Sequence, residues 1–177
     1  MKQKIKISTA ALLFLSALGY TQYYPVVKDK TSNIYQYNAY GMKVKTALTE
    51  SDPSGGMDYY RYNSYGIKEK TGGAIPNYNN DYDEYEYNQY GLPVKKSSYE
   101  EEGDLINQYD YNSYGLKQKT KTYVENEDEG YDIYEYNNYG LKEKVGTSVK
   151  NQQGDMDIYR YNSYGIKVKV QTVEEED

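Results

Sequence analysis

One seven-residue pattern returns six times along the chain and restricts what the chain can fold into. The pattern is Tyr-x-Tyr-Asn-x-Tyr-Gly, followed by an aliphatic residue and a lysine-rich segment. Its copies begin at Tyr35, Tyr60, Tyr85, Tyr109, Tyr134 and Tyr159, so the spacings are 25, 25, 24, 25 and 25 residues. A fixed period of this length is typical of repeat proteins, in which each unit is one supersecondary element.

Each copy of the motif predicts a β-hairpin. In the last copy, residues 158–161 and 166–170 alternate with a period of two, and Asn162 and Gly165 bracket the turn between them. Asparagine favours the first position of a type I turn and glycine tolerates the left-handed conformation, which predicts a three-residue loop with a glycine bulge. Helix is disfavoured, because Tyr, Asn and Gly are poor helix formers. The turn residues expected in five copies are Asn63, Gly66, Asn88, Gly91, Asn112, Gly115, Asn137, Gly140, Asn162 and Gly165.

A second turn is expected in each spacer between motifs. Residues 52–55, 100–103, 127–130 and 151–154 each end in glycine, and residues 79–81 are Asn-Asn-Asp. Two turns in each 25-residue unit predict an all-β fold. It is an antiparallel meander of tandem hairpins with about two strands per unit, extended or curled on itself.

Pairing across the motif turn predicts which side chains share a face. Tyr161 should lie opposite Lys167, and Tyr159 opposite Lys169, with the same arrangement in the other copies. An odd period would swap the faces in each repeat, so we expect an even loop or a bulge at the spacer turn. In the third copy Pro93 replaces the first lysine, and because proline cannot donate to a ladder we expect that strand to begin late or irregularly.

The motif resembles the tyrosine–aspartate (YD, or RHS-type) repeat family, whose unit is Tyr-x-Tyr-Asp-x-x-Gly followed by a short strand. Residues 134–141, with Asn137 in place of the aspartate, show the match well, and the resemblance covers roughly residues 34–170. It implies hairpins joined into a long sheet, in large secreted or cell-surface proteins. Asparagine replaces aspartate in all six copies, and the arginine that often follows the glycine is absent.

The first residues are typical of a signal peptide. Lys2, Lys4 and Lys6 precede a short apolar run at 7–18, and Ala17 and Gly19 fit a small-x-small cleavage site. An uncleaved anchor is the alternative. We therefore expect a signal peptide at 1–21, an N-terminal capping segment at 22–34, six hairpin repeats at 35–170 and an acidic tail at 171–177. The mature protein would be secreted, at the cell surface or in a periplasm, with no membrane span after signal removal.

Composition excludes several classes of function. Without the three leader lysines the net charge of −6 becomes −9, which argues against a nucleic-acid partner. The absence of Cys and His removes disulfides, nucleophilic triads and the commonest zinc ligands, and the acidic residues lie in the variable spacers. We therefore predict a non-enzymatic protein with no cofactor or metal. Calcium at the acidic spacer turns is an alternative to simple solvation of those turns.

The tyrosines are the candidate binding residues. Leu, Ile, Val and Phe total 29 of 177 residues, whereas Tyr alone numbers 27, so any fold must be stabilised mainly by tyrosine. Rows of rings could bind a cell-surface glycan or protein multivalently, with avidity offsetting weak single sites. Alternatively, lysine stems simply cover the rings, or the chain self-associates as a matrix protein through its sheet edges. The candidate residues are Tyr60, Tyr62, Tyr85, Tyr87, Tyr109, Tyr111, Tyr134, Tyr136, Tyr159 and Tyr161.

Overall fold

The protein is built from β-strands, as a computed structural model shows for residues 11–17, 20–26, 31–53, 55–77 and 81–175. All the regular elements in these ranges are strands. They are β1 Ala11–Ala17, β2 Tyr20–Val26, β3 Ser32–Tyr37, β4 Lys43–Ser51, β5 Met57–Tyr62, β6 Lys68–Pro76, β7 Tyr82–Tyr87, β8 Pro93–Glu102, β9 Leu105–Tyr111, β10 Lys117–Glu125, β11 Tyr131–Tyr136, β12 Lys142–Lys150, β13 Met156–Tyr161 and β14 Lys167–Glu175.

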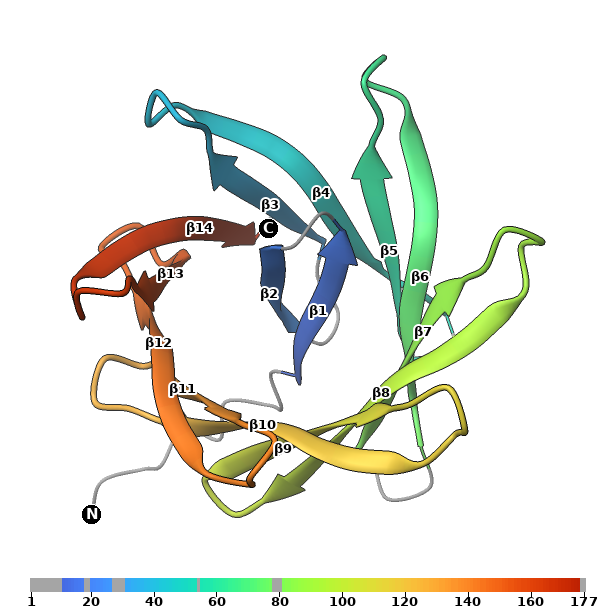
Figure 1. Cartoon of the computed structure of the whole chain (residues 1–177). Helices are drawn as coiled ribbons and strands as arrows, with labels where there is room; N and C mark the ends of the chain where they lie inside the picture. The colour runs from blue at the N-terminus through green and yellow to red at the C-terminus, as the bar shows by residue number, and fades with distance from the viewer. Residues whose placement is uncertain (1–10, 18–19, 27–30, 54, 78–80, 176–177) are drawn as a thin grey trace, which may run out of the picture.

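Strands β3 to β14 form one closed barrel (Figure 1). Each strand pairs antiparallel with the next along the chain, and β14 pairs with β3 to close the sheet. The predicted all-β meander with two strands per repeat is confirmed, and of the two expected forms the sheet takes the curled one. Strands β1 and β2 pair only with each other, and this hairpin lies inside the ring of twelve strands.

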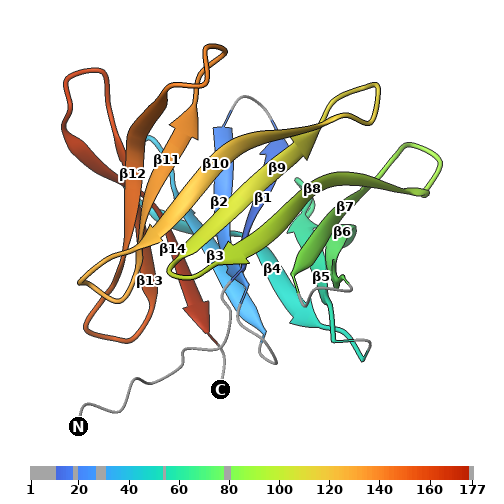
Figure 2. The same ribbon diagram turned by 90° about the horizontal axis from the view of Figure 1, so that it is seen from below.

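The two kinds of turn lie at opposite ends of the barrel. Because successive strands run up and down, all six motif turns fall on one end and the spacer turns on the other (Figure 2). We call the first end the motif rim; it comprises residues 38–42, 63–67, 88–92, 112–116, 137–141 and 162–166. The hairpins flare outward at this rim, so that neighbouring hairpins separate towards their tips.

The asparagine of each motif organises its turn. In the last copy the Gly165 amide donates to the Asn162 carbonyl at 2.9 Å, and the Asn162 amide donates to the Ile166 carbonyl at 3.0 Å. The Asn162 side-chain Oδ1 accepts from the amides of Tyr164 and Ile166, both at 2.9 Å. Gly165 has φ = 73°, in the left-handed region that favours glycine. All six motif turns share this geometry, so the predicted glycine-bulge turn is confirmed.

The predicted pairing across the motif is also confirmed. Tyr161 lies opposite Lys167 and Tyr159 opposite Lys169, and the same register holds in the other copies. The bulge that parity requires is present, but in the hairpin's second strand and not at the spacer turn. The residue that directly follows the second motif lysine has no partner in the ladder. This extra residue reverses which face of the sheet the following side chains occupy. The skipped residues are Thr46, Thr71, Lys96, Thr120, Val145 and Val170.

The expectation that the third repeat's strand begins late is wrong. Strand β8 begins at Pro93, which is the partner of Tyr87, at the same place as the corresponding strands of the other repeats. The Asn88 amide already donates to the Leu92 carbonyl at 2.9 Å, and pairs in an antiparallel ladder alternate between bonded and non-bonded. Pro93 therefore falls at a non-bonded position. The pairing of β8 with β9 begins only at Ser97, so no ladder bond is lost.

The inward face of the barrel forms the core. It combines Ile34, Ile133 and Ile158 with tyrosines that lie outside the seven-residue motif. Those tyrosines are almost completely buried: Tyr59, Tyr82, Tyr99 and Tyr123. Tyrosine thus replaces much of the missing aliphatic interior. These tyrosines lie mainly in the strand segments nearer the spacer turns. The barrel is therefore stabilised by tyrosines outside the motif as well as by the motif tyrosines and their lysines.

The chain ends depart from the expected segments. Ser32 and Ile34 of β3 are buried, so part of the expected capping segment at 22–34 is a strand of the barrel. Strand β14 continues to Glu175, and Thr172 and Val173 are buried against β3. Most of the expected acidic tail at 171–177 is thus the closing strand. Residues 1–10 lie outside the described residues, and removal of a signal peptide stays a prediction.

Candidate functional site

The first two tyrosines of each motif lie on the outward face of the barrel, where lysines interleave with them. We call this surface the outer belt; it consists of these tyrosines and the motif lysines that follow them. Five motifs have a lysine in the first of the two positions, and it lies over the ring of its own first tyrosine. The distances from ammonium to ring centre are 4.3 Å for Lys43–Tyr35, 3.9 Å for Lys68–Tyr60 and 4.1 Å each for Lys117–Tyr109, Lys142–Tyr134 and Lys167–Tyr159.

The second lysine reaches across to the next hairpin. In five of the six repeats it lies over the second tyrosine of the following motif, and Lys169 over Tyr37 carries this order across the closure of the barrel. The distances are 5.6 Å for Lys45–Tyr62, 5.8 Å for Lys70–Tyr87, 4.9 Å for Lys95–Tyr111, 5.5 Å for Lys119–Tyr136 and 5.3 Å for Lys169–Tyr37. All ten predicted binding tyrosines therefore share one face. Most are half-buried under lysine stems, and their role in binding stays a prediction.

Aspartates on the odd-numbered strands hold the second lysines in place. Lys70 pairs with Asp58 at 2.8 Å and Lys144 with Asp132 at 2.6 Å. The hydrogen bond to the aspartate is the main reason that the pKa of each lysine is raised, against the opposing effect of desolvation. Burial by itself would raise the pKa of Asp132, but hydrogen bonds from Lys144 and Thr147 outweigh it and hold this pKa below its usual value. Lys144 and Asp132 thus both stay charged near neutral pH.

The third tyrosine of each motif was not among the predicted binding or turn residues. It stands at the hairpin tip and exposes between 77% and 90% of its surface. The aliphatic residue two positions later exposes between 58% and 65%. Type I turns direct side chains at their central positions away from the hairpin, and this is the signal that could have identified them. The tip tyrosines are Tyr40, Tyr65, Tyr90, Tyr114, Tyr139 and Tyr164.

A second polar cluster lies on the inward face towards the motif rim. The buried Lys121 ammonium contacts Glu135 Oε1 at 3.0 Å, and Arg160 approaches the same oxygen at 3.7 Å. Burial lowers the pKa of Lys121 to about 8, and the nearby Glu135 opposes this shift only in part. Gln108 and Ser97 both donate to Asp110 at 2.8 Å. These contacts join β8, β9, β10, β11 and β13 through polar groups on the inward face.

No group of three or more His, Cys, Asp or Glu side chains in the described ranges is placed to hold a metal ion. No helix within these ranges is long and apolar enough to cross a membrane.

No protein-family model matches this chain, and no curated protein sequence matches it. The resemblance to the YD repeats therefore rests on the seven-residue motif, and functional conclusions depend on the geometry described above.

Proposed function

We propose that the protein is a secreted or cell-surface, non-enzymatic repeat module that binds a glycan or protein surface multivalently through its motif tyrosines. The supporting observation is the exposure of the six tip tyrosines around a single rim, each beside an exposed aliphatic side chain. Tyrosine offers a large, rigid contact with a polar tip at low entropic cost.

Repetition of this weak contact is what makes it useful. One exposed tyrosine with a neighbouring leucine or isoleucine offers little binding energy. Six such contacts held on one rigid barrel convert later binding events into intramolecular ones, and overall avidity can rise by factors of about 10² to 10⁴. The outer belt fixes each hairpin against the next, so that the tips keep their spacing.

Self-association as a matrix protein is the alternative. Its motivation from the sequence was a pair of open sheet edges. Strands β3 to β14 each pair on both sides, so this part of the chain offers no such edge. The exposed tips could still meet between molecules, and the test below therefore includes the oligomeric state.

A glycan array probed with the mature chain tests the proposal. The matched variant is the triple substitution Tyr65→Ser, Tyr114→Ser and Tyr164→Ser, which removes alternate tips. Because these side chains are exposed, the melting temperature should stay unchanged while binding falls by at least about tenfold. Size-exclusion chromatography over a range of concentrations should show a monomer. Equal binding by the variant, or wild-type chain that oligomerises without binding, would refute the proposal.

A further inference from the structure

Neighbouring hairpins face each other at six equivalent interfaces around the barrel, and the interface between hairpin β11–β12 and hairpin β13–β14 differs from the other five. In each of those five, the second motif lysine lies over the ring of the facing tyrosine. At this interface the facing ring is Tyr161, and Lys144 makes no such ring contact with it. Lys144 pairs with Asp132 at 2.6 Å.

The hydroxyl group of Tyr161 also lacks the hydrogen bond that equivalent tyrosines make to the preceding hairpin. The corresponding hydroxyls of Tyr37, Tyr111 and Tyr136 bond to Thr172, Ser98 and Thr122 at 3.2, 3.0 and 3.0 Å. Thr147 occupies the matching place before Tyr161, yet its hydroxyl donates to Asp132 at 3.0 Å and makes no bond to Tyr161. Among the described residues of this position that carry a hydroxyl, Thr147 alone lacks the tyrosine partner.

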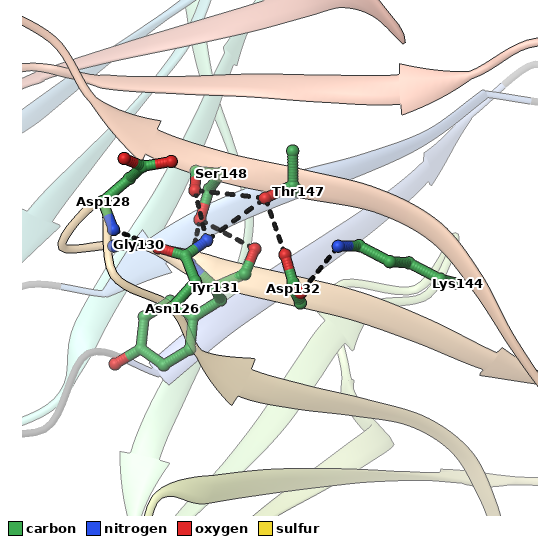
Figure 3. A network of polar contacts seen from close by, with 8 residues as sticks. All are labelled: Asn126, Asp128, Gly130, Tyr131, Asp132, Lys144, Thr147 and Ser148. Carbon is green, nitrogen blue, oxygen red and sulfur yellow. Dashed lines mark hydrogen bonds and ion pairs between the residues drawn. The ribbon is translucent and has the colours of Figure 1, made fainter. Parts of the chain in front are cut away.

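The spacer turn before β11 explains the difference (Figure 3). Asp–lysine pairs also occur in the third and sixth repeats, where the tyrosine contact is kept, so the pair by itself is not the cause. In the fifth repeat, Asn126 Nδ2 donates to Thr147 Oγ1 at 3.2 Å and to the Ser148 carbonyl at 3.0 Å. Asn126 thus takes the donor's place that a tyrosine hydroxyl fills in the other repeats.

Tyr161 and Lys144 border an open cavity of about 490 Å³. Its lining includes Tyr161, Lys144, Glu143, Val145, Asn162 and Ser163. The volume lies within the range of small-ligand sites, about 300–1,000 Å³. Glu143 is exposed and has no bonded partner in the described structure. The residue at its position is valine in three repeats and glutamine in one, and Glu69 in the second repeat is bonded to Asn63 at 2.6 Å.

We propose that this cavity binds one neutral sugar residue of a glycan, an inference that rests on the proposed function and names its ligand class. The ring of Tyr161 can pack against the C–H face of a sugar. The Glu143 carboxylate accepts from hydroxyl groups, whereas the Lys144 ammonium and the Asn162 amide donate to them. The presence of both charges disfavours an anionic ligand. The scarcity of aliphatic lining, with Val145 alone, disfavours an apolar one.

Titration with methyl glycosides tests this site apart from the tips, because a single sugar gains nothing from multivalency. The methyl glycosides of glucose, galactose, mannose and N-acetylglucosamine are added to the full mature chain, with NMR shifts of the Tyr161 ring and of the Ser163 backbone amide as the readout. The Ser163 amide reports binding in the variant that lacks the ring. At least one should shift these signals saturably. Tyr161→Ala and Glu143→Gln should each weaken its binding by about tenfold or more.

Three controls keep the outcome clear. Tyr136→Ala removes the equivalent ring at the interface between hairpins β9–β10 and β11–β12, and it should leave glycoside affinity unchanged. Tyr161→Phe keeps the ring and should retain most of the binding, which separates ring packing from misfolding. Asn126→Asp keeps the turn's acceptor oxygen and removes the amide donor. Thr147 then becomes free to bond Tyr161, and affinity should fall although no lining residue is changed.

The result distinguishes this inference from the proposed function. If no glycoside shifts the Tyr161 signals, or if Tyr136→Ala weakens binding as much as Tyr161→Ala, the cavity is not a sugar site. In either case, glycan-array binding that depends on the tip tyrosines would still support the multivalent module. Loss of array binding in the tip variant together with intact glycoside binding supports both.

Discussion

The three tyrosines of one motif meet three different environments, although they are separated by only a few residues. In the last copy, Tyr159 lies under its own hairpin's Lys167, Tyr161 faces the preceding hairpin, and Tyr164 stands at the tip. Strand alternation puts the first two on one face, and the turn sends the third away from the sheet. A single residue type therefore serves packing, hairpin-to-hairpin contact and surface exposure within one unit.

The motif glycine is required for its backbone conformation, and we expect Gly115→Val to destabilise the protein by about 1–3 kcal/mol. Gly115 has φ = 73°, and a Cβ there would meet no atom within 4 Å. The whole cost should therefore be backbone strain, which a β-branched side chain feels most. Chemical denaturation measures it. Gly115→Asn, which tolerates the left-handed region, should cost clearly less, and an equal cost for both would contradict the assigned turn.

Lys121 should give the stability of the protein an unusual dependence on pH. Its pKa is about 8 when folded and close to 10.5 when unfolded, because burial disfavours the charged form. Between these values the unfolded chain binds more protons than the folded one, so stability should rise with pH. Lys121→Met should remove this rise, because the side chain at this position then no longer titrates.

The upper limit of that window comes from the tyrosines. Burial raises the pKa of Tyr131 to about 12, so folded Tyr131 keeps its proton where the unfolded chain loses it, and stability should fall above about pH 10. Denaturant midpoints measured every half unit from pH 7 to about pH 9.5 therefore isolate the lysine. A wild-type curve that is flat across this range and parallel to that of Lys121→Met would show that Lys121 titrates normally.

At the scale of single elements, the bulge in the second strand of each hairpin keeps the motif tyrosines of all repeats on the same face of the sheet, although most repeats have an odd number of residues. Skipping Thr46 in β4 lets Leu48 pair with Tyr60 of the next hairpin on the outward face. The same step in every repeat keeps the outer belt continuous around the barrel. The device works because a bulge needs only one extra residue and leaves both flanking ladders intact.

The spacer turn before β11 carries a strained residue, and we expect Glu129→Gly to stabilise the protein by about 0.5–1 kcal/mol. Glu129 has φ = 53°, the position that Gly154 fills in the next spacer with φ = 93°. Its pair with Lys150 at 3.0 Å is exposed and contributes little. Thermal denaturation measures the change. An unchanged or lower melting temperature would mean that the pair outweighs the strain.

The next residue in this turn shows why glycine position alone misled the sequence interpretation. Gly130 was expected to take the left-handed conformation, but Glu129 does. Gly130 is needed for another reason, since a Cβ there would lie 2.2 Å from the Ser148 carbonyl oxygen. Gly130→Ala should therefore be destabilising although its φ is ordinary.

The sequence was sufficient for the hairpins, their register and the shared tyrosine face, because the signals are local. Asn162 and Gly165 define a turn, and the turn sets which residues of the flanking strands pair. Barrel closure was not predictable, since it depends on how twist accumulates over twelve strands and on β14 meeting β3. The cavity at Tyr161 was also hidden, because its opening depends on Asn126, 35 positions earlier in the chain.

At the scale of the whole molecule, charge is separated along the barrel axis. The six segments that run from the first motif tyrosine to the second motif lysine contain 13 basic and 5 acidic residues. The rest of the chain from residue 46 onward contains 3 basic and 21 acidic residues. The half of the barrel that ends at the motif rim is thus net positive at +8, and the remaining residues are net negative at −18. A surface met by the tips therefore lies on the side away from most of the acidic charge, which favours one orientation of binding.

Closure should contribute strongly to stability, because it buries the last strand and removes two edges at once. Gln171, Thr172 and Val173 of β14 are buried, and Thr172 bonds to both Tyr37 and Asp157. A chain ending at Val170 should melt about 10 °C lower or more, which corresponds to a loss of roughly 3–5 kcal/mol. It should also associate in a concentration-dependent way, since β3 and β13 would then present open edges. Deletion of residues 176–177 alone serves as the control and should change neither property. If the shorter chain instead has the same melting temperature as the full-length protein and stays monomeric, the ladder between β14 and β3 does not stabilise the barrel.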